Sequence, residues 1–237
     1  MKGTMEGSAS SVPTPWRPGS RLARLRASHS FGVVLIMIAV TFVFTSAAPS
    51  ESWAKSVLVL LQCSTLILAL WTSGLGRDKR AIVALIAIGL AVAIVQLLVG
   101  GTTLIGIVGI VNMLLVAATI GVIALGVIDQ GVVNRQSVTG AVCIYLLVGI
   151  AFTFIYSAVA VLGSGPFFAQ GTDGTESLQL YFSYVTLATL GYGDYTPATT
   201  LGHSLAVTEA LLGQLYLVTV VAVLVGNLSH QRAQRQP

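Results

Sequence analysis

The chain has 237 residues, of which 55% are hydrophobic and only 8% are charged. An ordinary soluble domain carries about 25% charged residues, so this composition excludes a soluble globular fold and indicates a membrane protein. The net charge is +4, but the long middle of the chain is almost uncharged, which argues against a nucleic-acid partner. Cys63 and Cys143 lie inside apolar runs, so they are expected to be packing residues rather than disulfide or zinc ligands.

Six apolar runs have the length of a membrane span. A helix needs about 17 to 25 residues to cross the hydrocarbon core, and a spanning segment must satisfy its own backbone hydrogen bonds, which favours helices over strands. The sequence therefore predicts helices over residues 31–47, 54–72, 81–99, 103–128, 138–162 and 205–228.

The basic residues predict the direction of these spans, because lysine and arginine near span ends stay cytoplasmic. If six spans alternate, only Lys55 falls on the outer side. The chain is therefore expected to be a multi-pass protein of the cell membrane with both termini in the cytoplasm. Residues 31–47 also have features of a signal peptide, since Ser46, Ala47 and Ala48 follow the apolar core, but the polar leader of 30 residues is too long for one.

The segment between the fifth and sixth spans contains an apolar run that is too short to cross. It covers residues 177–188, and a run of 10 to 14 residues is typical of a re-entrant or buried helix. Irregular backbone at membrane depth is tolerated only where protein or a water-filled cavity receives it. The run leads directly into Thr189-Leu190-Gly191-Tyr192-Gly193-Asp194.

This string resembles the filter of potassium channels, which reads Thr-Val-Gly-Tyr-Gly and is commonly followed by Asp. Thr186 lies three residues before Thr189, as in the wider family pattern, and Tyr195-Thr196-Pro197 matches the usual turn out of the filter. With one predicted span on each side, the resemblance covers about residues 138–228. It implies an all-α membrane protein with six transmembrane helices, a re-entrant pore helix and a selectivity-filter loop, in the tetrameric architecture of potassium channels.

The resemblance also implies a domain organisation. We expect a disordered basic cytoplasmic segment at 1–30, a four-helix transmembrane domain at 31–128, a cytoplasmic linker at 129–137, a pore domain at 138–228 and a short cytoplasmic tail at 229–237. No cytoplasmic ligand-sensing domain is expected after the last span. The arginines of the first segment are suited to anionic lipid headgroups, at about 1 kcal/mol each.

The fourth span, at 103–128, contains no arginine. A charge that crosses the membrane field contributes about 2.3 kcal/mol per 100 mV, so a span without charges responds little to voltage. Conventional voltage gating is therefore not expected. Asn112 within this span is expected to make an interhelical hydrogen bond.

The resemblance implies an ion site made of backbone atoms. Carbonyl oxygens can replace the hydration shell of K+, and we expect residues 189–193 to supply them, with K+ bound at Thr189, Leu190, Gly191 and Tyr192. Gly191 and Gly193 provide backbone angles that other residues resist. K+ is then the permeant ion, and no cofactor is expected. One filter copy per chain predicts a homotetramer, because four copies are needed to close a ring.

Side chains around this loop are expected to support it. The Thr189 hydroxyl is suited to be the innermost ligand, whereas Leu190 points away from the axis. Tyr192 is expected to pack on Tyr181 and Phe182 of the pore helix. The C-terminal end of that helix bears about half a negative charge, which favours a cation at the inner mouth of the filter.

Asp194 and Glu209 are expected to need partners. Some potassium channels carry a glutamate four residues before the filter threonine that pairs with the aspartate after the filter, but this chain has Val185 there. Asp194 is therefore expected to turn to the Tyr181 hydroxyl. Glu209 lies deep in a predicted span, where a charge costs about 2.5 to 3.5 kcal/mol. Hydrogen bonds to Ser183 or Thr186 satisfy it, and the alternative is a charge that faces the cavity and attracts cations.

The last span carries the candidate gate. Gly213 follows Gly193 by 20 residues, the spacing at which similar channels place the glycine that bends the inner helix, and close packing on a neighbouring helix is the alternative role. Steps of three and four residues place Gln214, Leu217, Val221 and Val225 on one face. This face is expected to line the cavity, with Val221 or Val225 as an apolar constriction.

The expected function is passive, potassium-selective conduction, and no enzymatic activity is expected. A non-selective cation channel is the first alternative, because Leu190 replaces the usual valine of the filter. A remote alternative is an intramembrane serine protease, for which Ser164 and His203 are the only candidates. Ser164 lies in a loop at a span end, where nothing positions it as a nucleophile.

Overall fold

The computed structural model describes residues 31–47, 51–73, 79–99, 103–129 and 135–233. The basic segment at 1–30, whose arginines are expected to bind lipid headgroups, lies outside these ranges, as do most of the expected linker and the end of the expected tail. Within the described residues every regular element is a helix, which confirms the all-α class. The helices are α2 (Gly32–Ala47), α3 (Ser52–Ser73), α4 (Lys79–Val99), α5 (Thr103–Asp129), α6 (Arg135–Leu162), α7 (Glu176–Leu187) and α8 (Thr200–Ala233).

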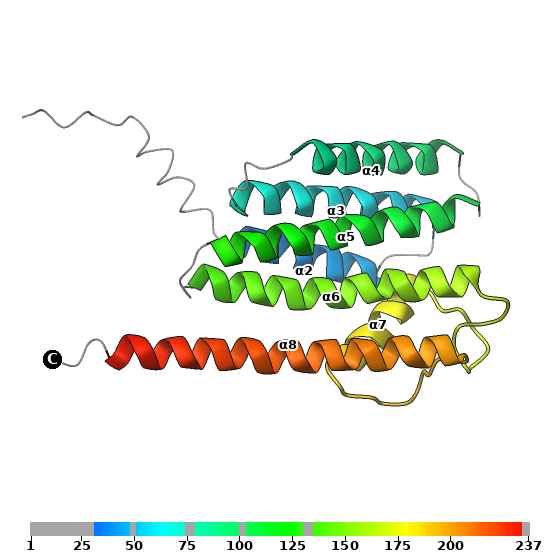
Figure 1. Ribbon diagram of the computed structural model, residues 1–237. Coiled ribbons are helices and arrows are strands. Elements are labelled where there is room, and N and C mark those ends of the chain that lie inside the picture. The colour runs from blue at the N-terminus through cyan, green and yellow to red at the C-terminus, as the bar shows by residue number, and fades with distance from the viewer. Residues whose placement is uncertain (1–30, 48–50, 74–78, 100–102, 130–134, 234–237) are drawn as a thin grey trace, which may run out of the picture.

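Six of these helices run side by side along one direction, and the short α7 lies between α6 and α8 near one end (Figure 1). Among the described residues, four segments are long and apolar enough to cross a membrane: Trp53–Ser73, Val108–Asp129, Gln136–Leu162 and Thr200–Val223. Gly32–Ala47 and Ile82–Val95 are shorter apolar helices. The 16 residues of α2 extend about 24 Å at 1.5 Å per residue, less than the roughly 30 Å of a hydrocarbon core.

The first core is formed mainly by α2, α3, α5 and α6, with Ala93 of α4 and Leu180 of α7 also buried in it. Leu66, Leu115, Ile123 and Leu147 are fully buried within it. Cys63 and Cys143 are free and buried in the same core, so the expectation that they are packing residues is confirmed.

A second, aromatic core holds the segments that flank α7. Tyr156 of α6 and Phe182 of α7 pack with Phe167 and Phe168 of the intervening loop. The loop before α7 is joined to the segment after it, because Ala169 N–H donates to the Thr196 carbonyl at 2.8 Å. The short helix and the segment that follows it therefore sit in a frame built by α6 and this loop.

Candidate functional site

Helix α7 is a short helix, too short to span a membrane, with a capping residue at each end. It has 12 residues, begins after Thr175, whose side chain accepts a hydrogen bond from Leu178 N–H, and ends at Ala188. Gln179, Leu180, Phe182, Ser183, Val185 and Leu187 are buried. A helix that is buried along most of its length but too short to cross is what the sequence predicts for a re-entrant segment.

The backbone of residues 189–193 has an alternating conformation. φ is 56° at Thr189, 55° at Gly191 and 77° at Gly193. In an extended strand with uniform angles, successive carbonyls point in opposite directions. A positive φ at every second residue turns them toward one side, which is the arrangement that a carbonyl-lined ion path requires.

Thr189 is the part of this pattern that sequence reasoning missed. Glycine reaches positive φ at little cost, but a β-branched residue there is a strained outlier that usually occurs at functional sites. Leu190 N–H donates to the Val185 carbonyl at 2.9 Å, and Thr189 N–H donates to the Thr186 carbonyl at 2.9 Å. These bonds to the end of α7 hold the strained residue in place.

Asp194 is held by the partner that the sequence suggested. The Tyr181 hydroxyl donates to Asp194 Oδ2 at 2.8 Å, and this hydrogen bond raises the pKa of Tyr181 to about 12. Its ring stacks on Tyr192, with centroids 6.5 Å apart and an interplanar angle of 13°.

Gln170 is a further contact of this segment that sequence reasoning missed. Its Nε2 donates to the Asp194 carbonyl at 2.9 Å, and its Oε1 accepts a hydrogen bond from Thr196 N–H at 3.3 Å. One amide side chain from the loop before α7 thus holds in place the backbone that follows residues 189–193, which we call the filter segment. A glutamine 24 residues earlier in the chain gives no local signal of this contact.

The expectation that Phe182 supports Tyr192 is wrong. Phe182 is buried in the aromatic core, with its ring 5.1 Å from that of Tyr156 and 5.4 Å from that of Phe168. Consecutive residues of a helix point about 100° apart. Because Tyr181 turns toward the filter segment, Phe182 faces α6 instead.

Glu209 of α8 is fully buried and hydrogen-bonded. Its Oε1 lies 2.5 Å from Ser183 Oγ of α7, so the expected Ser183 contact is confirmed. The Tyr156 hydroxyl of α6 donates to Oε2 at 2.5 Å, a partner that the sequence did not indicate. The alternative of a charge facing an open cavity is wrong for this conformation of the chain, because the side chain is 0% exposed.

Gly213 lies where α8 crosses the end of α7. A Cβ atom at this position would lie 2.6 Å from the Leu187 carbonyl oxygen and 2.8 Å from Leu187 Cδ1. Of the two expected roles, hinge and close packing, this geometry supports packing, because only a glycine lets the two backbones approach this closely. Helix α8 continues without a break through Gly213.

The residues expected to line the cavity lie on an uncovered part of α8. Gln214 is exposed, and Leu217 and Val221 are 39% and 55% exposed. The side chain of Val225 lies outside the described residues. Helix α8 itself is longer at both ends than the expected span of residues 205–228.

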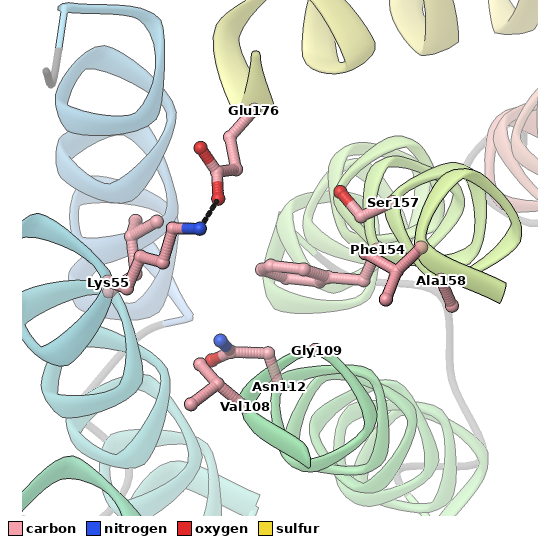
Figure 2. A pocket seen from close by; sticks show the side chains of 10 residues that line it. Lys55, Val108, Gly109, Asn112, Phe154, Ser157, Ala158 and Glu176 are labelled. Atoms are coloured by element: carbon pink, nitrogen blue, oxygen red, sulfur yellow. Dashed lines mark ion pairs between the residues drawn. The ribbon is translucent and has the colours of Figure 1, made fainter. Parts of the chain in front are cut away.

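The first helices contact α7 directly. Lys55 Nζ of α3 lies 3.1 Å from Glu176 Oε1 in the first turn of α7 (Figure 2). Ser177 Oγ donates to the Ser46 carbonyl of α2 at 2.9 Å. The one lysine expected on the outer side therefore has a partner, and both α2 and α3 contact α7 directly.

A small cavity of about 40 Å³ lies beside this ion pair, with Asn112 and Ser157 in its lining (Figure 2). Among the described residues, Asn112 Oδ1 has no hydrogen-bond partner although the side chain is buried. The expected interhelical hydrogen bond is therefore not made by this oxygen. The cavity is lined by apolar side chains together with Lys55, Asn112, Ser157 and Glu176, and its volume has room for a water molecule that would hydrogen-bond to this oxygen.

Replacing Lys55 by methionine is expected to lower the free energy of unfolding by about 1 kcal/mol or less, because the partly exposed pair is partly screened. Thermal unfolding of the purified protein measures this change. The charge-swapped variant Lys55→Glu/Glu176→Lys should recover most of the loss, and Glu51→Gln on the same side is the control. Equal losses in Lys55→Met and in the swapped variant would contradict a role for the pair.

Comparisons with known proteins match part of the chain. A family model described as an ion channel matches residues 160–230. Potassium voltage-gated channel subfamily A member 4 of human and of mouse is 29% identical over 87 residues, which are 35% of this chain and 13% of that protein. Probable potassium channel protein 2 of Methanocaldococcus jannaschii is 46% identical over 46 residues, which are 18% of this chain and 13% of that protein.

The chain thus spans about an eighth of the length of the curated relatives that it matches. No solved structure matches it. The matched family region begins in α6 and extends through α7, the filter segment and most of α8. Residues 160–230, which include the filter-like segment, thus match an ion-channel family model, and parts of the chain are similar to potassium channel proteins.

Proposed function

We propose that the protein is a potassium-selective channel in which residues 189–193 of four identical subunits form the filter. The observation that carries this proposal is the positive φ at Thr189, Gly191 and Gly193, directly after a buried half-span helix. Four such strands around one axis present rings of carbonyl oxygens to a dehydrated cation. K+ then binds at the levels of Thr189, Leu190, Gly191 and Tyr192.

The exposure of α8 supports the homotetramer. Only 11% of the span window in Thr200–Val223 is buried in a single chain, against 44% to 50% in the other three candidate spans. Leu190 and Tyr192 are also 57% and 66% exposed. Neighbouring subunits would cover the filter side chains and part of α8, whereas lipid would cover the outer faces of the other helices.

The inner half of the pore follows from the same arrangement. In it, Gln214, Leu217, Val221 and Val225 line the cavity, and Val221 or Val225 closes the path by excluding water. Six spans, with α2 and α4 as short ones, place both termini in the cytoplasm. Lys55 and Glu176 then lie on the outer side, near the start of the pore helix.

Conduction is proposed to be passive and not conventionally voltage-gated. Helix α5 contains no arginine or lysine, so it lacks the charges on which a membrane field acts. The name of the human relative refers to voltage gating, but that property is not part of the proposal for this chain.

Reversal potentials of the purified protein in vesicles, with K+ on one side and Na+ on the other, test the proposal. We expect a value close to the K+ equilibrium potential. A value that follows neither gradient would show a non-selective cation pore, in which Leu190 alters the filter enough to abolish selectivity. Mass measurement of the solubilised particle should give four subunits, and a monomer would overturn the proposal.

A further inference from the structure

The buried contacts of Glu209 form a closed set of oxygen atoms contributed by three helices. Ser183 Oγ of α7 lies 2.5 Å from Glu209 Oε1 and 2.7 Å from the Gly149 carbonyl oxygen of α6. Tyr156 of α6 contacts Glu209 Oε2 at 2.5 Å. All three side chains are 0% exposed, so bulk water does not take part.

Counting protons shows which form of Glu209 fits these contacts. The set contains three short oxygen-to-oxygen contacts, but the Ser183 and Tyr156 hydroxyls bring one proton each, and a carbonyl only accepts. If Glu209 were ionised, one contact would join two oxygens with no proton between them. If the carboxyl is protonated, Glu209 donates to Ser183, Ser183 donates to the Gly149 carbonyl, and Tyr156 donates to Glu209 Oε2.

The surroundings favour the same form. An ionised carboxylate in an apolar interior is strongly disfavoured unless a cation pairs with it. The only ion pair found among the described residues joins Lys55 and Glu176. Neutral oxygen atoms of α6 and α7 are the observed contacts of the carboxyl, and no positive charge is among them.

The position of the set gives it a mechanical role. Ser183 is on the buried side of α7, about two turns before the filter segment. Gly149 of α6 lets α7 approach closely, because a Cβ atom at Gly149 would lie 2.8 Å from the Tyr184 ring. On α8, Glu209 lies one helical turn before Gly213, and Gly213 contacts Leu187 at the end of α7. The Glu209 carboxyl therefore holds α8 against α7 and α6, behind the filter segment.

We infer that Glu209 is held in its protonated, uncharged form and acts as a positioning residue, donating a hydrogen bond to Ser183 so that α8, α7 and α6 are locked together behind the filter. This inference rests on the proposed channel function only for its consequence, which is a stable filter. Because α7 has Val185 at the position where some potassium channels carry a glutamate, α7 itself has no acidic side chain there to support the filter. The Glu209–Ser183 hydrogen bond provides such support from α8 instead. It also leaves no fixed negative charge behind the filter.

Infrared spectroscopy of the purified protein tests the protonation directly. We expect the carbonyl stretch of a protonated carboxylic acid, and we expect this band to be absent from Glu209→Gln. A carboxylate band at Glu209 would overturn the inference. The signal does not depend on which ion is conducted, so a pore that failed to select K+ would remove the proposed function and leave this result intact.

Potassium flux into vesicles tests the positioning role. Glutamine can donate from Nε2 to Ser183 and accept at Oε1 from Tyr156, so Glu209→Gln is expected to keep flux within about twofold of the unmodified protein. Glu209→Leu keeps the volume and loses the donor, so flux is expected to fall about tenfold or more. If Glu209→Gln impairs flux as strongly as Glu209→Leu does, the negative charge itself matters and the inference is wrong.

Ser183→Ala provides a second variant in case Glu209→Leu does not assemble. It removes the acceptor of the Glu209 proton and the donor to Gly149, so it should reduce flux about as much as Glu209→Leu. In the double variant Ser183→Ala/Glu209→Leu the loss of flux should be close to that of either single variant and smaller than the two losses combined. Normal flux in Ser183→Ala would contradict the inference.

Discussion

Replacing Gly191 or Gly193 by alanine is expected to abolish potassium-selective conduction. Their φ angles are 55° and 77°, and a Cβ atom would meet no atom within 4 Å at either position within one chain. Within one chain, backbone strain is therefore the expected source of the effect, at about 1–2 kcal/mol per residue in each of four subunits. Relief of this strain rotates a carbonyl away from the axis, and we expect K+ flux to fall at least about a hundredfold.

The matched control for these variants is Gly171→Ala. Gly171 has φ of 80° and the same open surroundings, but it lies in the loop before α7. It should therefore incur similar strain without changing the ratio of K+ to Na+ permeability. If Gly171→Ala lost selectivity as fully as Gly193→Ala, the loss would reflect general instability, and the assignment of the filter would lose its support.

Replacing Gly213 by alanine is expected to destabilise the protein by about 1–3 kcal/mol, the usual cost of overpacking a tight contact. The added methyl group would lie 2.6 Å from the Leu187 carbonyl oxygen, so α8 must move away from the end of α7. Thermal unfolding and subunit dissociation of the purified protein measure the effect. Displacement of Leu187 should also reduce K+ flux, because Leu187 lies two residues before Thr189.

The sign of this change separates packing from hinge bending. Alanine is about 1 kcal/mol more favourable than glycine inside a helix. A glycine that served only as a hinge would therefore give a more stable, less easily opened channel when replaced by alanine. Gly121→Ala in α5, where a Cβ meets no atom within 4 Å, is the control and should be neutral or stabilising.

The sequence predicted the elements of the pore region well because their signals are local. The length of the apolar run over residues 177–188 predicted a helix too short to cross, and the glycines at 191 and 193 predicted a loop with special backbone angles, although the positive φ of Thr189 was not predicted. The pairing of Asp194 with Tyr181 was also predictable, because Tyr181 lies on the short helix α7 and Asp194 follows its end by seven residues. These inferences needed only the geometry of one helix and one loop.

Contacts between distant helices were not predictable in the same way. Tyr156 reaches Glu209 across 53 residues of sequence, and its pattern within α6 is that of any buried tyrosine. Lys55 was visible as an isolated basic residue on the outer side, but nothing in the sequence identified Glu176 as its partner. The prediction for Phe182 was wrong because the sequence of an aromatic pair on a short helix does not indicate which of the two rings faces the neighbouring helix.

Helix α6 contributes to both cores, and this has a consequence for how the protein can be divided. Cys143, Leu147 and Phe154 of α6 belong to the first core, whereas Phe152 and Tyr156 belong to the aromatic one. Leu180 of α7 is buried within the first core as well. A fragment that starts at α6 would lose the packing of this helix against α2 and α5, so transplanting the segment from α6 onward onto another scaffold would require new packing partners for that surface.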